Sequence, residues 1–67
     1  MNMQNNIKHL RAEKGLSQSK LAELVEVRRE TIVHLENNKY NPSLKLAYQI
    51  ANVFKLPLEE VIWFEEQ

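Results

Sequence analysis

The sequence contains neither cysteine nor aspartate. Without cysteine it can form neither a disulfide nor a thiolate metal site, which is typical of a protein kept in the reducing cytoplasm. The longest uninterrupted apolar run is the stretch 61–64, whereas a bilayer span needs roughly 20 residues, and the N-terminus lacks the apolar core of a signal peptide. We therefore expect a cytoplasmic protein with no membrane segment.

The chain is also short, at 67 residues, and has one glycine and two prolines. This length predicts one domain over residues 1–67, because ordinary domains run to roughly 100 to 150 residues. A chain of this size buries only about 60% of its unfolded surface, so a core shared with a second subunit would help it to fold. The scarcity of glycine and proline, with much Leu, Ala, Glu and Lys, favours helix over sheet.

Charge is balanced in total but not along the chain. The formal net charge is zero, yet all nine Lys and Arg residues lie in residues 1–58, which carry a net charge of +4. Residues 59–67 hold four glutamates and carry −4. This distribution suggests that one end faces an anion while the acidic end points away from it, although a solvated acidic tail needs no function.

Cap residues and apolar spacing predict five helices. The expected segments are a helix after Asn5 or Asn6 to about Lys14, a second from Ser17 to about Val25, a third from Arg28 or Arg29 to about Asn37, a fourth after the Asn41-Pro42-Ser43 turn, and a short fifth from Pro57. The last residues, 61–66, continue the fifth helix or form a strand, because their β-prone cluster has no helical period.

The third predicted helix has two distinct faces. Ile32 and Leu35 define the buried side, and the opposite face carries Glu30, Val33, His34 and Asn37. An isolated exposed valine is ordinary on protein surfaces. On a helix in a DNA major groove, however, the valine could meet a thymine methyl group and the polar side chains could meet base edges.

Arg28 and Arg29 stand where Ser, Thr or Asp would normally cap this third helix. The arginines forgo about 1 kcal/mol of capping and place cations at the positive end of the helix dipole. A phosphate or a guanine at this end would account for them, since arginine binds guanine O6 and N7 with two hydrogen bonds. The alternative is a pair of solvated arginines, one of them bonded to Glu26 or Glu30.

Several segments together resemble the Cro and phage-repressor (XRE-like) type of helix-turn-helix protein. They are Gly15-Leu16-Ser17-Gln18-Ser19-Lys20-Leu21-Ala22, Thr31-Ile32, Leu35-Glu36-Asn37 and Lys39-Tyr40-Asn41-Pro42-Ser43-Leu44, and the resemblance covers residues 5 to about 62. It implies a compact, all-α, lambda-repressor-like fold of five helices. It also implies that the helix at 28–37 enters the major groove and that dimers place two such helices about one DNA turn apart.

The resemblance further assigns roles to individual residues. Those expected to contact bases are Gln18, Arg28, Arg29, Glu30, Val33 and His34. Those expected to contact phosphates are Ser17, Asn37, Lys39, Tyr40 and Asn41, and Gln18 is expected to bond a phosphate as well. In this family an arginine of the first helix pairs with the glutamate of the Leu-Glu-Asn element. This implies a structural ion pair between Arg11 and Glu36.

The sequence departs from the family pattern at three positions. Glu26 stands where most relatives have the glycine of the turn, Arg28 where Ser or Thr caps the third helix, and Glu30 where glutamine is frequent. A carboxylate near DNA is repelled by phosphates unless it accepts from cytosine N4 or braces an arginine.

The C-terminal segment is similar to that of small stand-alone regulators of the cytolysin-operon repressor type. Such relatives are five-helix dimers, some with a short strand pair that joins the two chain ends. The likeness implies that residues 56–67 make the dimer contact, through Leu56, Leu58, Ile62, Trp63 and Phe64. In a monomer the two aromatic side chains would instead fold onto the fourth helix, or remain exposed.

Catalysis has little support in the sequence. The serines lie at expected helix starts, and His9 and His34 lie on different helices with no third ligand, so we expect no catalytic, cofactor or metal site and no small-molecule ligand. We expect a homodimeric, sequence-specific regulator, most simply a repressor, that binds an inverted repeat in double-stranded DNA. The competing hypothesis is a protein-interaction module or antitoxin component, for which a net charge of zero would be less surprising.

Overall fold

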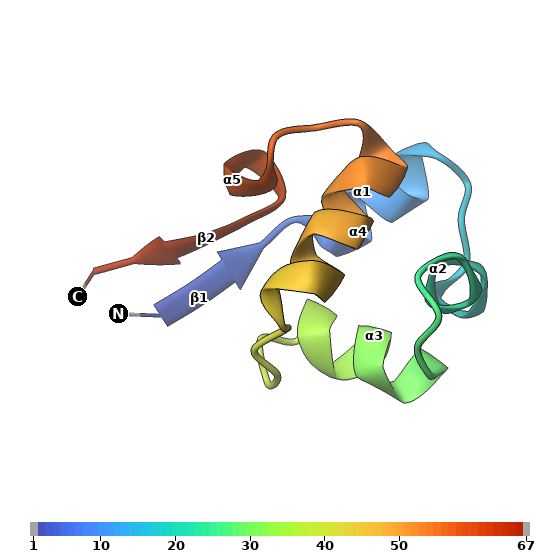
Figure 1. The fold of residues 1–67 in the computed structure, drawn as a ribbon, viewed down its shortest axis with the longest axis horizontal. Coiled ribbons are helices and arrows are strands. Elements are labelled where there is room, and N and C mark those ends of the chain that lie inside the picture. Colours follow the sequence, from blue (N-terminus) through green and yellow to red (C-terminus); the bar gives the residue numbers. More distant parts are fainter. Residues whose placement is uncertain (1, 67) are drawn as a thin grey trace.

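The computed structural model describes residues 2–66, which form five helices and a two-stranded sheet (Figure 1). The elements are β1 (Asn2–Asn5), α1 (Ile7–Glu13), α2 (Gln18–Leu24), α3 (Arg29–Glu36), α4 (Leu44–Phe54), α5 (Leu58–Val61) and β2 (Ile62–Glu65). The predicted all-α fold of five helices with a terminal strand pair is confirmed. The predicted domain 1–67 extends beyond the described residues at Met1 and Gln67, and the predicted dimer segment 56–67 extends beyond them at Gln67.

Two of the predicted N-cap residues, Ser17 and Ser43, form capping hydrogen bonds. The Ser17 hydroxyl accepts a hydrogen bond from the Lys20 backbone N–H at 2.9 Å, and the Ser43 hydroxyl accepts one from the Leu46 N–H at 3.1 Å. Both are N-cap bonds of the kind that satisfies a free donor in the first turn of a helix. Gly15, with φ +67°, follows the end of α1 in a left-handed conformation that glycine adopts without strain.

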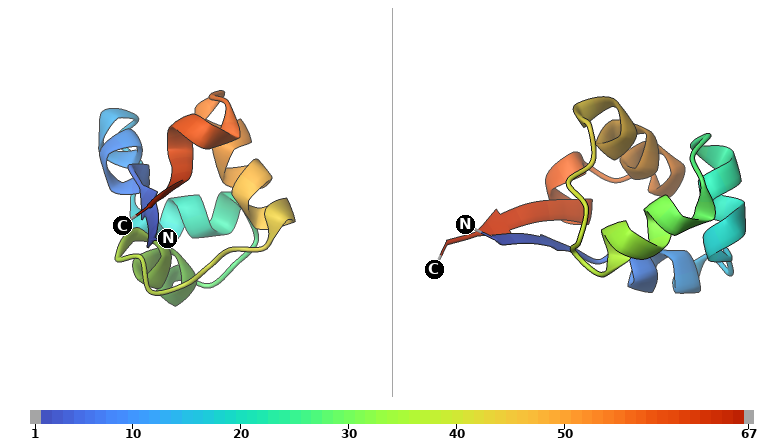
Figure 2. Two further views of the ribbon diagram at one scale, coloured as in Figure 1. Left: turned by 90° about the vertical axis from the view of Figure 1, so that its left-hand side faces the viewer. Right: turned by 90° about the horizontal axis from the view of Figure 1, so that it is seen from below.

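The two ends of the chain pair as strands. β1 and β2 are antiparallel, with Asn2 opposite Glu65 and Asn5 opposite Ile62. This pairing resolves the two possibilities left open for residues 61–66, since α5 ends at Val61 and the strand begins at Ile62. Figure 2 shows the strand pair projecting from the helical body.

The core draws on every helix. The largest fully buried side chains are Ile7 of α1, Leu21 of α2, Ile32 and Leu35 of α3, Ile50 of α4 and Val61 of α5. Because each helix buries at least one large apolar side chain in the same cluster, the core fixes how α3 is presented at the surface. None of the described helices is both long and apolar enough to cross a membrane.

A tight turn joins α2 to α3. Glu26 has φ +59°, and the Val27 N–H donates to the Ala22 carbonyl at 3.0 Å. The turn makes the two helices cross steeply, so that α2 is seen almost end-on in Figure 1 while α3 lies across the view. Glu26 thus adopts the left-handed conformation at the position where most relatives have glycine, and a residue with a Cβ in this conformation costs on the order of 1 kcal/mol.

Candidate nucleic-acid interface

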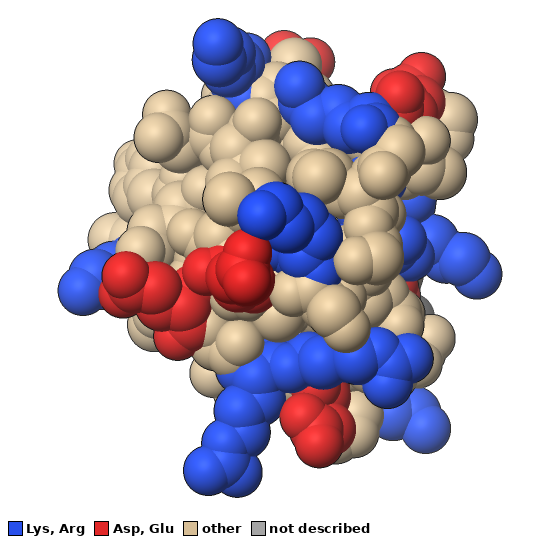
Figure 3. Space-filling view, turned by 90° about the vertical axis from the view of Figure 1, so that its right-hand side faces the viewer, with Lys and Arg blue, Asp and Glu red and all other residues tan. Residues whose placement is uncertain are grey.

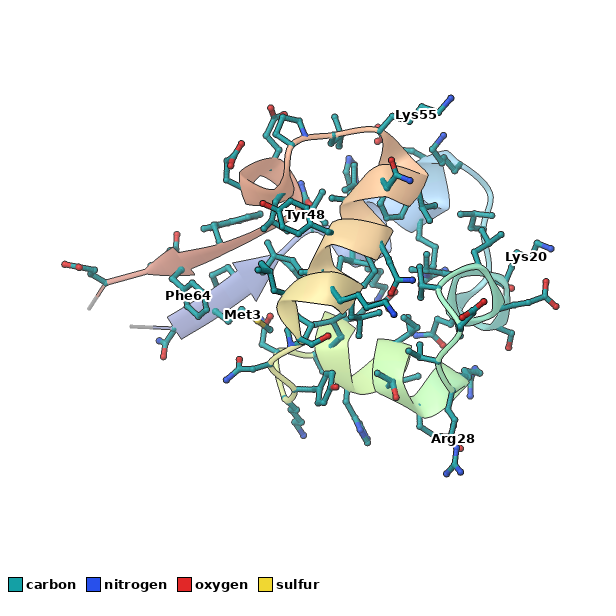
Figure 4. All side chains as sticks on the ribbon, in the orientation of Figure 1. Met3, Lys20, Arg28, Tyr48, Lys55 and Phe64 are labelled. Atoms are coloured by element: carbon teal, nitrogen blue, oxygen red, sulfur yellow. The ribbon has the colours of Figure 1, made fainter. Side chains whose placement is uncertain are left out.

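The N-terminus of α3 is exposed and carries two arginines. Arg28 occupies the N-cap position in extended conformation, with φ −76° and ψ 152°, and its side chain makes no capping hydrogen bond. Arg29 is the first helical residue, and both arginines are exposed. In Figure 4 the Arg28 side chain extends away from the body of the protein. The free backbone N–H groups and the two guanidinium groups together form a positive end that attracts anions.

The outward face of α3 presents a mixture of side chains to solvent. Glu30, His34 and Asn37 are exposed as predicted, whereas Val33 is only partly exposed. Val33 lies one position after the buried Ile32, about 100° around the helix, so the body of the protein covers part of it. Glu30 lies in the first turn, where its carboxylate interacts favourably with the helix dipole.

Arg11 and Glu36 form an ion pair between α1 and the last residue of α3. Arg11 Nε lies 2.8 Å from Glu36 Oε2, and Arg11 Nη2 donates to Oε1 at 3.3 Å. Arg11 Nη1 also donates to the Leu16 carbonyl at 2.8 Å. The side chains are only 15% and 4% exposed. A carboxylate this well covered depends on its hydrogen-bond donors, so the pair ties the first and third helices together.

Gln18 connects this ion pair to Arg29. Its Nε2 donates to Glu36 Oε1 at 3.0 Å, and its Oε1 accepts from Arg29 Nη2 at 3.0 Å. The resemblance had suggested that Gln18 contacts a phosphate and a base. The structure shows an amide that already bonds to the protein on both sides. The hydrogen bonds from Gln18 to Glu36 and Arg29 were not predicted, since they depend on how α2 packs against α3.

The residues expected to contact phosphates lie at the start of α2 and just after α3. Asn37 is the C-cap residue of α3, and the Lys39 N–H closes the helix end by donating to the His34 carbonyl at 2.8 Å. Lys39, Tyr40 and Asn41 follow in an exposed loop. Ser17 is the exposed N-cap residue of α2, and its hydroxyl already accepts the capping hydrogen bond from the Lys20 N–H.

Basic and acidic side chains are distributed unevenly over the molecule. Figure 3 shows the face around α2 and the start of α3, on which lysines and arginines outnumber acidic groups. The acidic residue of α2, Glu23, accepts a 2.8 Å hydrogen bond from Lys20, which holds the pKa of its carboxyl below the ordinary value. The four glutamates of α5 and the C-terminal segment lie at the end of the molecule opposite the N-terminus of α3 (Figure 1).

Comparison with known proteins identifies the architecture. Residues 7–61 match the model of a family described as helix-turn-helix. The chain belongs to the helix-turn-helix family, of the XRE type. This is a family of DNA-binding transcriptional regulators and not of enzymes, in agreement with the sequence-based prediction.

Individual helix-turn-helix proteins are similar over nearly the whole chain. An uncharacterised HTH-type transcriptional regulator from Archaeoglobus fulgidus is 54% identical, over 97% of this chain and 92% of its own. Among solved structures, a proposed DNA-binding protein from Bacteroides fragilis has a TM-score of 0.79 and 32% identity, covering 90% of this chain and 97% of that one. The restriction-modification controller protein C.AhdI from Aeromonas hydrophila has a TM-score of 0.74 and 31% identity, covering 81% and 82%.

The helix-turn-helix domain also exposes an apolar face, built by α4, α5 and the strand pair. Leu44, Tyr48 and Phe64 are 66%, 57% and 57% exposed. Tyr48 and Phe64 are labelled in Figure 4, Tyr48 on α4 and Phe64 on β2. Beside them lies a groove lined by Met3, Asn41, Pro42, Leu44, Ala47, Leu58, Ile62 and Phe64. We call Leu44, Tyr48, Phe64 and this groove the apolar face.

The predicted dimer residues contribute unequally to the apolar face. Phe64 is exposed, Leu56, Leu58 and Trp63 are half-buried, and Ile62 is buried within the chain. Met3, Leu44 and Tyr48, which also belong to the apolar face, are not among the predicted dimer residues. The sequence contained a signal for Leu44 and Tyr48. The helix α4 has apolar residues on more than one side, and this pattern is typical of a helix that is covered on more than one side.

Proposed function

We propose that this protein is a sequence-specific DNA-binding transcriptional regulator that binds an inverted-repeat operator as a homodimer and represses by occupying it. The observation that carries the proposal is the N-terminus of α3. No side chain caps this helix end, and Arg28 and Arg29 are exposed there. Membership of the XRE-type family supports it.

The side chains at the N-terminus of α3 and on its outward face would contact the bases. Arg28 and Arg29 have the donor geometry for guanine O6 and N7, and His34 has a ring donor for base edges. Val33 offers a methyl group to thymine, and Glu30 offers an acceptor to cytosine N4 or a brace to a neighbouring arginine. These contacts would set the operator sequence.

Phosphate contacts would fix the register of α3 in the groove. Lys39, Tyr40 and Asn41 lie in the exposed loop after α3, and Ser17 and Asn37 lie at helix ends, where backbone and side-chain donors suit phosphate oxygens. The acidic residues of α5 and the C-terminal segment lie at the end of the molecule opposite the N-terminus of α3, so a net charge of zero does not oppose DNA binding by this end of the helix (Figure 1).

The apolar face would form the homodimer contact. Leu44 and Phe64 are exposed and line the groove, Tyr48 is exposed one helical turn along α4 from Leu44, and a second copy of the same face would cover them. A two-fold dimer of this kind repeats α3 on each subunit, which calls for two half-sites about one DNA turn apart.

The test is selection of bound duplexes from a random pool, followed by affinity measurements on the selected duplex at several salt concentrations. We expect an inverted repeat, and an affinity that falls steeply with salt, by a slope of about −0.9 in log K for each phosphate neutralised. Recovery of no preferred sequence, or an affinity that is unchanged between low and moderate salt, would instead favour a protein-interaction module.

A further inference from the structure

The side chain of Asn5, the last residue of β1, joins three segments of the chain. Its Oδ1 accepts from the Ile7 N–H at 3.1 Å, and its Nδ2 donates to the Leu35 carbonyl at 2.9 Å and to Asn38 Oδ1 at 2.7 Å. We propose that Asn5 is a positioning residue that holds the loop after α3, so that residues 39–41 meet the DNA backbone in a fixed arrangement. This inference rests on the proposed function and extends it, because it gives β1 a role in DNA binding that needs no contact with DNA.

The backbone determines which way the Asn5 amide points. The Ile7 N–H is only a donor and the Leu35 carbonyl is only an acceptor. The amide therefore directs its oxygen toward the start of α1 and its nitrogen toward the end of α3. One of the two N–H groups of the nitrogen bonds to Leu35, and the second is then available for Asn38 Oδ1. Asn5 thus presents a donor of fixed direction to the first residue of the loop.

Asn38 is the residue at which the chain leaves α3. It has φ +59°, and its N–H donates to the Leu35 carbonyl at 3.0 Å. A left-handed residue directly after a helix end turns the chain away from the helix, and so sets the direction of the residues that follow. The hydrogen bond to Asn5 holds the Asn38 side chain from a segment 33 positions away. The exposed Lys39 and Tyr40 come next, so their placement depends on this turn.

The strand that carries Asn5 is itself well held. Asn5 lies opposite Ile62 in the strand pair, and the Asn6 N–H donates to the Val61 carbonyl at 3.2 Å. Met3, two residues earlier and therefore on the same face of the strand as Asn5, is only 8% exposed. An exposed loop loses conformational freedom when it binds a ligand. A bond to a fixed strand removes part of that loss in the free protein.

Asn5 could instead serve only to stabilise the fold. The two roles predict different results. Loss of stability raises the unfolded fraction but leaves the loop of the folded molecules as ordered as before. Loss of positioning makes the loop more mobile within the folded protein. It also weakens binding to all duplexes alike, because phosphate contacts carry no sequence information.

The first experiment uses the free protein and needs no operator. We would measure nuclear magnetic resonance order parameters of the backbone N–H groups in the wild type and in Asn5→Ser. The serine hydroxyl can still accept from the Ile7 N–H, but its side chain is too short to bond to the end of α3. We expect the order parameters of Lys39 and Tyr40 to fall in the variant while that of Val27, in the turn before α3, is unchanged. Wild-type values for Lys39 and Tyr40 would overturn the inference.

Asn2→Ser is the matched control. Asn2 lies on the same strand as Asn5 but is exposed, so the same change of side chain should leave the loop as ordered as in the wild type. An equal fall in Asn2→Ser would show that any substitution in β1 loosens the loop, and this would count against Asn5 as the positioning residue.

Asn38→Gly tests whether the bond between the two asparagine side chains is responsible. Glycine adopts the left-handed conformation without strain but lacks the oxygen that Asn5 binds. Asn5→Ser should therefore lower the loop order parameters less in the Asn38→Gly background than in the wild type. The flexibility of the glycine is present in both proteins of that comparison and cancels. An equal fall in the two backgrounds would refute a role for this bond.

The second experiment measures affinity on the duplex selected by the wild type and on its single-base variants. The temperature and concentration are chosen so that circular dichroism and sedimentation show the same folded and dimeric fractions for all proteins. Asn5→Ser should weaken binding to every duplex by roughly three- to tenfold and leave the ratios between duplexes unchanged, while Asn2→Ser binds like the wild type. An unchanged affinity, or a loss at one base pair alone, would refute the positioning of the phosphate-contacting loop. If the wild type selects no duplex, the proposed function fails, while the order parameters still decide whether Asn5 holds the loop.

Discussion

At the scale of the residue, the start of α3 is less stable than it would be with an ordinary N-cap residue. A serine or threonine at the N-cap would supply the hydrogen bond that Arg28 does not make, a difference of about 1 kcal/mol. Two cations beside the positive end of the dipole add an unfavourable interaction. Glu30, in the first turn, offsets only part of it. An anion bound at this position would remove both costs, which is why these side chains are the first to test.

Substitution of Arg29 and of Lys39 should separate base recognition from general affinity. Arg29→Ala should cost roughly 1 to 3 kcal/mol on the preferred duplex and relax the preference at one base pair. Lys39→Ala, in the exposed loop after α3, should weaken binding to all sequences about equally and reduce the salt slope by about one. Titration of single-base variants of the selected duplex measures both effects. If Arg29→Ala kept the full sequence preference, Arg29 would not be the base-contacting residue.

The buried carboxylate of Glu36 should be important for stability. Glu36→Ala leaves Arg11 without its partner and Gln18 without its acceptor, so we expect the free energy of unfolding to fall by about 3 to 5 kcal/mol. Glu30→Ala, on the exposed face of the same helix, is the matched control and should change it by less than about 0.5 kcal/mol. Urea unfolding at one fixed protein concentration gives both values. Equal effects at the two positions would show that the ion pair does not hold the helices together.

The sequence predicted this site only in part. The arginines at the start of α3 and the exposed Glu30 and His34 follow from helical spacing, which is local. The pairing of Arg11 with Glu36 required a resemblance, because the two residues lie 25 positions apart. The hydrogen bonds of Gln18 followed from neither argument. Their existence depends on the packing of α2 against α3, which no local pattern specifies.

At the scale of the element, the turn between α2 and α3 keeps a strained residue. Glu26 adopts φ +59° where glycine would do so without a Cβ clash. Lys55, after α4, is similar at φ +57°, and Asn38, after α3, has φ +59°. Asparagine tolerates this region better than glutamate or lysine, so the strain is greatest at Glu26 and Lys55.

Replacement of Glu26 by glycine should therefore stabilise the protein. We expect Glu26→Gly to raise the free energy of unfolding by about 0.5 to 1 kcal/mol, since relief of the left-handed strain exceeds the added entropy of the unfolded chain. Lys55→Gly should raise the free energy of unfolding for the same reason. Glu26→Ala keeps a Cβ and should give no gain, which makes it the control in the same thermal or urea unfolding measurement. A gain in the alanine variant equal to that in the glycine variant would show that the charge of Glu26, and not its backbone, was unfavourable.

The elements differ in how far the sequence specifies them. Ser17, Ser43 and Gly15 define helix ends within a few residues, and each acts through neighbours in the chain, so the helices could be predicted. Residues 62–65 were left open between helix and strand. Their strand conformation depends on pairing with residues 2–5 at the other end of the chain, and such a non-local partner leaves no periodic signal in either segment.

At the scale of the whole molecule, charge and apolar surface are segregated. The exposed arginines of α3 lie at one end, and the acidic α5 and C-terminal segment lie at the other (Figure 1). The apolar face occupies α4, α5 and the strand pair, apart from the outward face of α3. A second subunit on the apolar face would therefore leave both copies of α3 free to meet DNA.

Disruption of the apolar face should convert the protein into a monomer without unfolding it. Tyr48 is 57% exposed, so Tyr48→Glu leaves the core intact but places a charge where a second copy would bury it. By sedimentation we expect the wild type to be a dimer and the variant a monomer. The variant should bind the full inverted repeat no more tightly than a single half-site, because the two copies of α3 are no longer linked. Leu24→Glu, which replaces a 48% exposed leucine on α2 outside the apolar face, is the control and should remain dimeric. A dimer that persists in Tyr48→Glu would show that the subunit contact lies elsewhere. A wild type that sediments as a monomer at all concentrations would show that the protein does not act as a preformed dimer.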